Sequence, residues 1–267
     1  MNTATNPSIG EAVRQVLTTA DPTAKVMTAR ATARAWRQGR LSHEFVDDLP
    51  DTPTRPARPE LLRPRDMPRR GKGTSVTKRA ALIHSLAHIE FVAIDLAFDM
   101  IGRFGAQFPR EFVDDWMQVG AEEAMHFVLL DRRLREMDSF YGALPAHDGL
   151  WDTAKETAYD ATARLAIVPM VLEARGLDIT LQTVEKFKAQ GDYLTAKVLN
   201  RIFHDEIKHV SYGTKWFESC CESQKVNRHD HWKMLVKTHF RGGLKPPFND
   251  SARDAAGLTQ DYYSAIE

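Results

Sequence analysis

Two short motifs of glutamate and histidine are the residues in this chain best suited to chemistry. The pattern Glu-x-x-His occurs at Glu123 and His126, within "EEAMHF", and again at Glu206 and His209, within "HDEIKHVSYG". Residues three apart lie on one face of an α-helix, so each pair can direct a carboxylate and an imidazole to one point. The rest of each face is apolar, and a buried carboxylate without a compensating charge is costly. The two motifs therefore predict metal binding.

A single glutamate precedes each motif on another apolar helical face. The interval in sequence from Glu90 to Glu123 is identical to the interval from Glu173 to Glu206. Its length suits a chain that rises through one helix, turns and returns to the same level, at about 1.5 Å per residue. The two halves look like copies of one helical hairpin. Six side chains are then expected to meet at one height of a four-helix bundle: Glu90, Glu123, His126, Glu173, Glu206 and His209.

These four carboxylates and two imidazoles form a ligand set that suits iron or manganese. Ferritin-like dimetal carboxylate proteins use one glutamate from each of two helices and a Glu-x-x-His from each of the other two. The four negative charges of the glutamates would also be balanced by two divalent cations, which lowers the cost of burying these carboxylates. We therefore expect two iron ions, with manganese as the alternative, and we expect the six residues to be both the metal ligands and the catalytic centre.

Other polar residues near the motifs are assigned lesser roles. His84 and His88 are four residues apart, but His88 points across the helix from Glu90, so a supporting or surface role is predicted for both. Arg175 and Asp178 follow the glutamate of the third helix closely and could orient ligands, because a metal-bound histidine usually donates its second N–H to a partner.

Long helices are predicted to position these residues. Beyond residue 74 the sequence is helical in pattern and poor in strand signals. Core helices are expected at 75–104, 109–138, 153–176 and 191–222. The segment "GLDIT" is expected to end the third of them, before a shorter helix at 180–189. Pro169 removes a backbone hydrogen bond inside the third helix and predicts a kink there. The predicted fold class is all-α, a ferritin-like four-helix bundle.

The N-terminal part differs from the bundle. Helical patterns at 9–20 and 24–39 precede a segment with six prolines between residues 50 and 73, which favours an extended arm over helix or strand. We predict three regions. Residues 1–73 form a helical segment and a Pro/Arg-rich arm packed on the bundle, residues 74–225 form the dimetal bundle, and residues 226–267 form a helical C-terminal tail.

Composition and charge narrow the class of protein. With 43% hydrophobic and 27% charged residues, the 267-residue chain is typical of a globular protein. The N-terminus lacks a basic start followed by an apolar stretch, and no run of about eighteen apolar residues occurs, so we expect a soluble, cytoplasmic protein without a membrane partner. The adjacent Cys220 and Cys221 indicate structural thiols. Residues 1–80 hold 15 Lys and Arg against 8 Asp and Glu, which favours a basic segment wrapping an acidic body over a nucleic-acid arm.

Several longer stretches resemble a known family, the bacterial ferritin-like proteins labelled domain of unknown function 455. They are "RPARPELLRPRDMPRRG", "HSLAHIEFVAIDLA", "FPREFVDDW", "EEAMHF", "YGALPAHDGLW", "ARLAIVPMVLEARGLDIT" and "HDEIKHVSYG". The resemblance covers nearly the whole chain. The resemblance implies a ferritin-like bundle, and all six predicted ligands match ligand positions of the family. It does not imply a particular reaction.

Three functions are compatible with such a site. The first is an oxidoreductase, similar to ferritin-like hydroxylases, that activates O2 or peroxide for an unknown substrate, with a possible electron-donor protein and a possible homodimer. The second is a manganese catalase-like enzyme that removes peroxide. The third is a non-enzymatic iron-binding or storage protein, ranked lower because of the long N-terminal region. The basic first eighty residues would suit a nucleic-acid substrate only weakly.

Overall fold

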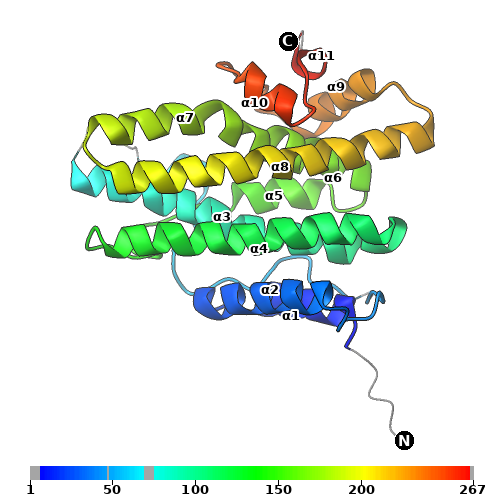
Figure 1. The fold of residues 1–267 in the computed structure, drawn as a ribbon, viewed down its shortest axis with the longest axis horizontal. Helices are drawn as coiled ribbons and strands as arrows, with labels where there is room; N and C mark the ends of the chain where they lie inside the picture. The colour runs from blue at the N-terminus through cyan, green and yellow to red at the C-terminus, as the bar shows by residue number, and fades with distance from the viewer. Residues whose placement is uncertain (1–6, 47, 69–74, 265–267) are drawn as a thin grey trace, which may run out of the picture. The chain divides into compact units, whose positions relative to one another are not determined.

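The computed structural model describes residues 7–46, 48–68 and 75–264, and every regular element assigned in them is a helix (Figure 1). Two isolated β-bridges, between Ser8 and Ser42 and between Leu61 and Ala146, also occur in the described residues. The predicted all-α class is confirmed. The chain divides into two compact units, Met1–Trp151 and Asp152–Glu267.

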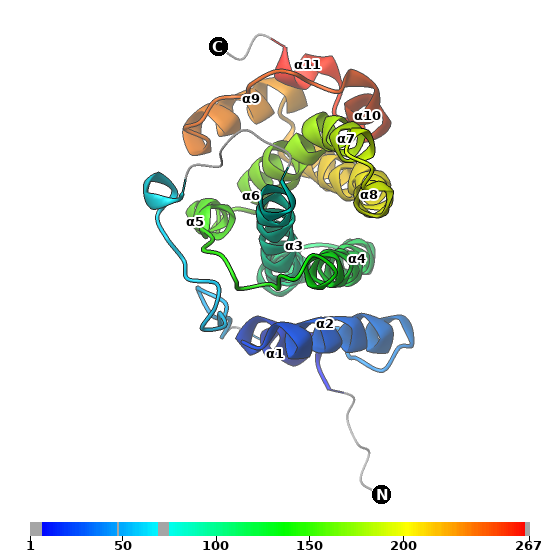
Figure 2. The ribbon, with the colours of Figure 1, turned by 90° about the vertical axis from the view of Figure 1, so that its left-hand side faces the viewer.

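The first unit is built on a helical hairpin. α3 (Val76–Phe104) and α4 (Arg110–Arg135) pack against each other and are joined by the short 3-10 turn η2 (Gly105–Gln107). α1 (Ile9–Thr18) contacts α3, and α2 (Pro22–Arg37) contacts α4, so both lie alongside the hairpin (Figure 2). The helices expected at 9–20, 24–39, 75–104 and 109–138 are all present, with ends that coincide or shift by at most three residues.

Polar caps fix where these helices begin. The Ser8 side chain accepts a hydrogen bond from the backbone N–H of Glu11, and the Glu11 carboxylate accepts one from the Ser8 N–H, so α1 starts with a complete capping box. The side chains of Asp21 and Ser75 cap α2 and α3 by accepting the backbone N–H of Ala24 and Lys78, without the reciprocal bond. Each cap satisfies N–H groups that the first helical turn leaves unpaired.

The proline-rich arm, as far as residue 68, is bound to the first unit. Its Thr54 N–H donates to the Leu17 carbonyl, and Leu62 pairs with Ala146 through an N–H···O bond of 2.8 Å. A short 3-10 turn, η1 (Pro64–Asp66), follows. Residues 69–73 of the predicted arm lie outside the described residues, and the predicted region boundaries at 73/74 and 225/226 stay predictions.

The second unit contains a second hairpin and the C-terminal helices. α6 (Ala161–Ile167), the π-helical turn η3 (Val168–Glu173) and α7 (Ala174–Ala189) run on without a break and pack against α8 (Tyr193–Gln224). α9 (Arg228–His239) contacts α6 and α8, α10 (Asp250–Ala255) contacts α7 and α8, and α11 (Gln260–Tyr263) contacts α9. α5 (Gly149–Glu156) spans the boundary between the units.

Two predicted helix boundaries in this region are wrong. A single helix at 153–176 was expected, but α5 ends at Glu156 and a new helix starts at Ala161, because Asp160 caps it by accepting the Thr162 N–H at 2.8 Å. The segment "GLDIT" does not end a helix. It lies within α7, whose buried residues Leu177, Val184 and Phe187 continue one apolar face beyond it.

Hydropathy singles out one helix. Among the described residues, the segment 76–107 is long and apolar enough to cross a membrane, and 72% of its most apolar window is buried inside the structure. A core helix of a soluble protein has this property, so the finding is consistent with a soluble protein.

Candidate metal centre

Glu90, Glu123 and His126 come together inside the first unit. His126 Nδ1 lies 3.3 Å from Glu90 Oε2 and 3.4 Å from Glu123 Oε2, and the ligand atoms of the three residues all lie within 4.8 Å of one another. Their exposed fractions are 6%, 1% and 0%. Carboxylate oxygens and an imidazole nitrogen at such separations form a buried group that could hold a metal ion.

Close packing of α3 on α4 holds these side chains together. Gly120 lies one turn before Glu123, and a Cβ atom at Gly120 would stand only 2.7 Å from Cε2 of Phe98 on α3. Any larger residue at position 120 would have to displace the Phe98 ring, so the glycine favours this close approach of the two helices. Ile94, one turn after Glu90, and Phe127, next to His126 in the sequence, are also buried, so the group lies on buried stretches of α3 and α4.

Burial changes the protonation of the group when no cation is present. It raises the pKa of Glu90 well above the usual range, and the neighbouring charge of Glu123 raises this pKa further. The hydrogen bond with His126 acts in the opposite direction but is the smaller effect. A divalent cation would reverse the balance, because its charge favours the ionised form of both glutamates.

The second unit contains the matching motif on α8. His209 Nδ1 lies 3.7 Å from Glu206 Oε2, and the exposed fractions are 0% for His209 and 9% for Glu206. The pair has the same spacing and the same buried setting as Glu123 and His126. It forms the second Glu-x-x-His expected from the sequence.

Glu173 is the last residue of the π-helical turn η3, which packs against α8. It is only partly buried. The kink predicted at Pro169 takes the form of this turn, since a proline has no N–H to donate to the ordinary α-helical ladder. Gly213 accommodates it, because a Cβ atom there would lie 2.4 Å from the Pro169 Cβ.

His84 and His88 are not surface residues. His84 Nε2 accepts a hydrogen bond of 2.9 Å from the Gly142 N–H, and His88 Nδ1 is 2.9 Å from the Tyr141 hydroxyl. Burial lowers the pKa of His88 to about 4, so the ring is neutral at pH 7. Both histidines attach the loop after α4 to α3. The surface alternative was therefore wrong, and a role in supporting the metal ligands stays a prediction.

Arg175 and Asp178 do not orient metal ligands within the second unit. Arg175 donates to the backbone carbonyls of Lys245 and Pro247 at 2.7 and 3.2 Å, and Asp178 forms a buried ion pair of 2.7 Å with Arg253. Both residues bind the C-terminal segment to α7. The prediction failed because both partners lie about seventy residues away, and periodicity along one helix carries no information about them.

A buried charge network in the first unit was missed by the sequence analysis. Asp95 on α3 is fully buried and pairs with Lys25 of α2 and Arg55 of the arm. Arg55 also binds Asp148 at 2.9 Å. An aspartate within the apolar run "FVAIDLAF" was a visible signal, since a buried charge needs a partner. Its two partners could not be identified from spacing.

Cys220 and Cys221 are free thiols near the end of α8. Burial raises the pKa of Cys221 to about 11, which makes the thiolate scarce at neutral pH. This agrees with the structural role predicted for them.

Similarity to known proteins extends over most of the chain. Residues 18–264 match the family described as "Protein of unknown function (DUF455)". A protein of Haemophilus influenzae (strain ATCC 51907 / DSM 11121 / KW20 / Rd), described as "Uncharacterized protein", is 38% identical over 211 residues, which are 77% of this chain and 73% of that protein. No solved structure matches. Because the family match runs nearly from end to end, this protein belongs to the DUF455 family.

Proposed function

We propose that this protein is a non-haem dimetal carboxylate oxidoreductase that binds two metal ions, iron in first place, and activates O2 or peroxide for a substrate not yet identified. Six residues would act as ligands: Glu90, Glu123, His126, Glu173, Glu206 and His209. The observation that carries the proposal is the buried cluster of Glu90, Glu123 and His126, whose ligand atoms lie within 4.8 Å of one another.

The chemistry of the donors supports a metal in preference to a structural hydrogen-bond cluster. Two carboxylates this close repel each other, and the buried surroundings raise the pKa of Glu90. A folded protein would reach a less costly arrangement with an apolar pair at these positions. A bound divalent cation removes the repulsion and uses both oxygens and the imidazole nitrogen as ligands.

The second unit supports the proposal of two metal ions per chain. It repeats the Glu-x-x-His motif as a buried pair 3.7 Å apart, and its preceding glutamate stands at the same interval in sequence as in the first unit. Each half alone offers two carboxylates and one imidazole, which is a partial ligand set for iron or manganese. We propose that the halves join in one centre, with the ligand order of ferritin-like dimetal proteins.

The protein's own residues would orient the ions and exclude water. When bound, a pair of redox-active ions would supply the one- and two-electron chemistry of O2 or peroxide that amino acids lack. The first half of the site would stay dry because Glu90, Glu123 and His126 are themselves at most 6% exposed. The π-helical turn that ends at Glu173 supports a functional role, because such turns occur frequently at functional sites.

The test is elemental analysis of protein purified without added metal, followed by assays of the protein reloaded with Fe(II) or Mn(II). We expect iron, with O2 consumed in proportion to Fe(II) and reductant. Manganese together with rapid peroxide breakdown would replace the oxygenase proposal with a catalase-like function. Iron accumulating far beyond two ions per chain in closed shells, seen by electron microscopy, would replace it with storage. Absence of any bound or bindable metal would refute the dimetal proposal.

A further inference from the structure

A group of arginines lies on the exposed face of α2 in the first unit. Residues 22–43 contain no Asp or Glu, so no acidic residue of this stretch opposes their charge. Arg30, Arg34 and Arg37 follow one another at steps of four and three and are all exposed, which places them on one face of the helix. Arg40 follows in the turn after the helix and is also exposed. We call these four residues the arginine row.

The arginine row has no acidic partner in the part of the chain that the structure describes. None of its four guanidinium groups makes a hydrogen bond or an ion pair there. Other cations of the N-terminal region do have partners. Lys25 and Arg55 pair with the buried Asp95, and Arg14 pairs with Asp48 at 3.4 Å. The basic segment is therefore attached to the bundle helices through Lys25 and Arg55, and the charge of the arginine row stays available to a partner.

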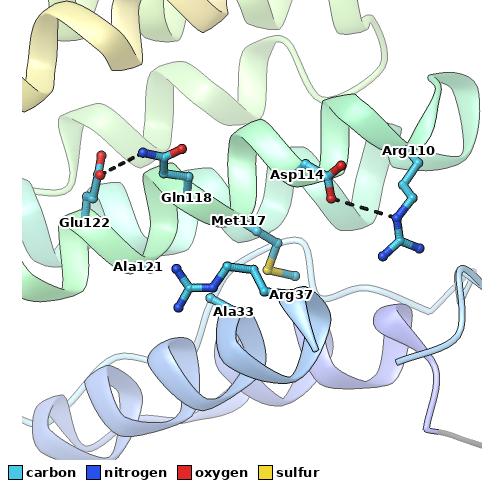
Figure 3. A pocket seen from close by; sticks show the side chains of 8 residues that line it. All are labelled: Ala33, Arg37, Arg110, Asp114, Met117, Gln118, Ala121 and Glu122. Carbon is cyan, nitrogen blue, oxygen red and sulfur yellow. Dashed lines mark hydrogen bonds and ion pairs between the residues drawn. The ribbon is translucent and has the colours of Figure 1, made fainter. Parts of the chain in front are cut away.

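Acidic residues of the neighbouring helix α4 do not neutralise the row. A hollow of about 570 Å³ lies between α2 and α4, and Asp114 and Glu122 are the carboxylates in its lining. Asp114 accepts a hydrogen bond of 2.6 Å from Trp36 Nε1, and Glu122 accepts one of 3.0 Å from a glutamine of α4. Figure 3 shows Arg37 and Arg110 at opposite ends of this hollow. A single anionic group cannot rest on both, whereas a polymer with one charge per unit needs no common point.

Structural roles explain only part of the row. Cations in the last turn of a helix stabilise it through the helix dipole, and Arg34 and Arg37 lie in that turn of α2. Arg30 lies earlier in the helix and Arg40 lies beyond its end. A surface that serves solubility alone usually carries charges of both signs, interspersed. The row carries one sign only.

We propose that the arginine row binds the phosphate backbone of a nucleic acid, without dependence on base sequence or on the metal centre. The planar guanidinium fork matches the oxygens of a phosphate group. Arg30 and Arg37 are about 10 Å apart along the helix axis, a length over which one strand of a duplex presents about three phosphates. A membrane surface suits the row less well, because a helix lying on a membrane buries an apolar face. Among the described residues of α1 and α2, Met27 is the only large apolar side chain that is exposed.

The experiment measures binding of the full-length protein to a fluorescein-labelled RNA duplex of about 16 base pairs, by fluorescence anisotropy. The salt concentration is varied between about 50 and 200 mM, because each neutralised phosphate contributes about 0.9 to the slope of log affinity against log salt. We expect a wild-type slope of magnitude about three or more. Arg30→Gln, Arg34→Gln and Arg37→Gln should each lower this magnitude by about one, and should weaken binding about threefold or more at the lowest salt.

Two further variants serve as controls. Arg132 on α4 is 78% exposed and pairs with Glu136 at 3.1 Å, so Arg132→Gln removes the same charge from the first unit without changing the row. Its salt slope should equal that of the wild type. Arg34→Lys keeps the charge and should keep the slope, while losing part of the affinity that comes from the fork. All these side chains are exposed, so the variants should unfold at nearly the wild-type temperature.

Other results would overturn the proposal. An equal decrease of the slope in Arg132→Gln and in the row variants would show diffuse attraction to the whole protein. Row-dependent binding to vesicles that contain phosphatidylserine, without binding to RNA, would assign the row to a membrane. Polyglutamate binding as tightly as RNA would assign it to an acidic protein partner. Absence of RNA binding at about 50 mM salt, in folded protein, would remove the site altogether.

Discussion

Replacing Asp95 with asparagine should destabilise the first unit by about 3–5 kcal/mol at pH 7, the usual cost of breaking a buried ion pair from one side. The side chains of Lys25 and Asp95 are both fully inaccessible to solvent, so the Lys25 ammonium of the variant cannot turn to water. Arg55 is 12% exposed and keeps Asp148 as a partner, so most of the loss comes from Lys25.

The assay is guanidinium unfolding followed by tryptophan fluorescence. Two variants serve as references. Asp48→Asn removes a surface pair with Arg14, in which Asp48 is 94% exposed, and should cost less than about 0.5 kcal/mol. The double variant Asp95→Asn with Lys25→Met removes both buried charges and should recover much of the loss, because an apolar replacement leaves no unpaired charge.

The pH dependence gives a second check with a defined sign. Burial lowers the pKa of Lys25 below its ordinary value of 10.5, and the charge of Asp95 opposes this shift. The folded state therefore binds fewer protons than the unfolded state between the two pKa values, and stability rises with pH in that window. Without the charge of Asp95, the pKa of Lys25 in the folded state falls further, so the rise in stability starts at a lower pH. The loss of stability in Asp95→Asn relative to the wild type should consequently become smaller between pH 7 and pH 10.

Two results would refute this reasoning about the buried network. One is a deficit below about 1 kcal/mol at pH 7, which is too small for an unpaired buried ammonium. The other is a loss of stability that becomes larger as the pH rises, which would mean that the unpaired ammonium of Lys25 does not cause the destabilisation.

The close contact at Gly213 and the buried thiols give two further predictions. Gly213→Ala should cost about 1–3 kcal/mol, because its Cβ would meet Pro169 at 2.4 Å. Gly176→Ala, with nothing within 4 Å, should be neutral or stabilising by up to about 1 kcal/mol, and equal effects at both glycines in thermal unfolding would contradict the packing argument. At pH 8 a maleimide should modify Cys221 at least about tenfold more slowly in the folded protein than in urea, since burial raises its pKa to about 11. Peptide mapping can distinguish modification of Cys221 from that of Cys220. Equal modification rates of Cys221 in the folded protein and in urea would refute the prediction that its thiol is protected by burial.

The sequence predicted most of the architecture because its helices are long and periodic. The starts of α1 and α3 follow from Ser8 and Ser75, which precede helical patterns and act as caps. The error at 153–176 arose where helical patterning continues through a turn, and Asp160, a cap signal within that range, was passed over. The error at "GLDIT" arose from treating Gly176 as a stop, although glycine inside a helix only lowers its propensity.

The buried cluster in the first unit was predictable for a related reason. Glu90, Glu123 and His126 lie on faces that periodicity identifies, and the interval between the two glutamates placed them at one level of a hairpin. Contacts between distant segments were not predictable. The partners of Asp95 come from α2 and from the arm, and no local pattern connects Lys25 and Arg55 to it.

The central claim, one centre of two ions shared by both halves of the chain, is tested most directly by anaerobic titration of the metal-free protein with Fe(II). We predict saturation at about two ions per chain. Glu123→Gln and Glu206→Gln should each bind fewer ions, although they lie on different helices. Glu122→Gln, next to Glu123 but hydrogen-bonded to Gln118, should bind as wild type does. Unchanged stoichiometry and affinity in both ligand variants, in protein shown to be folded by circular dichroism, would contradict the account.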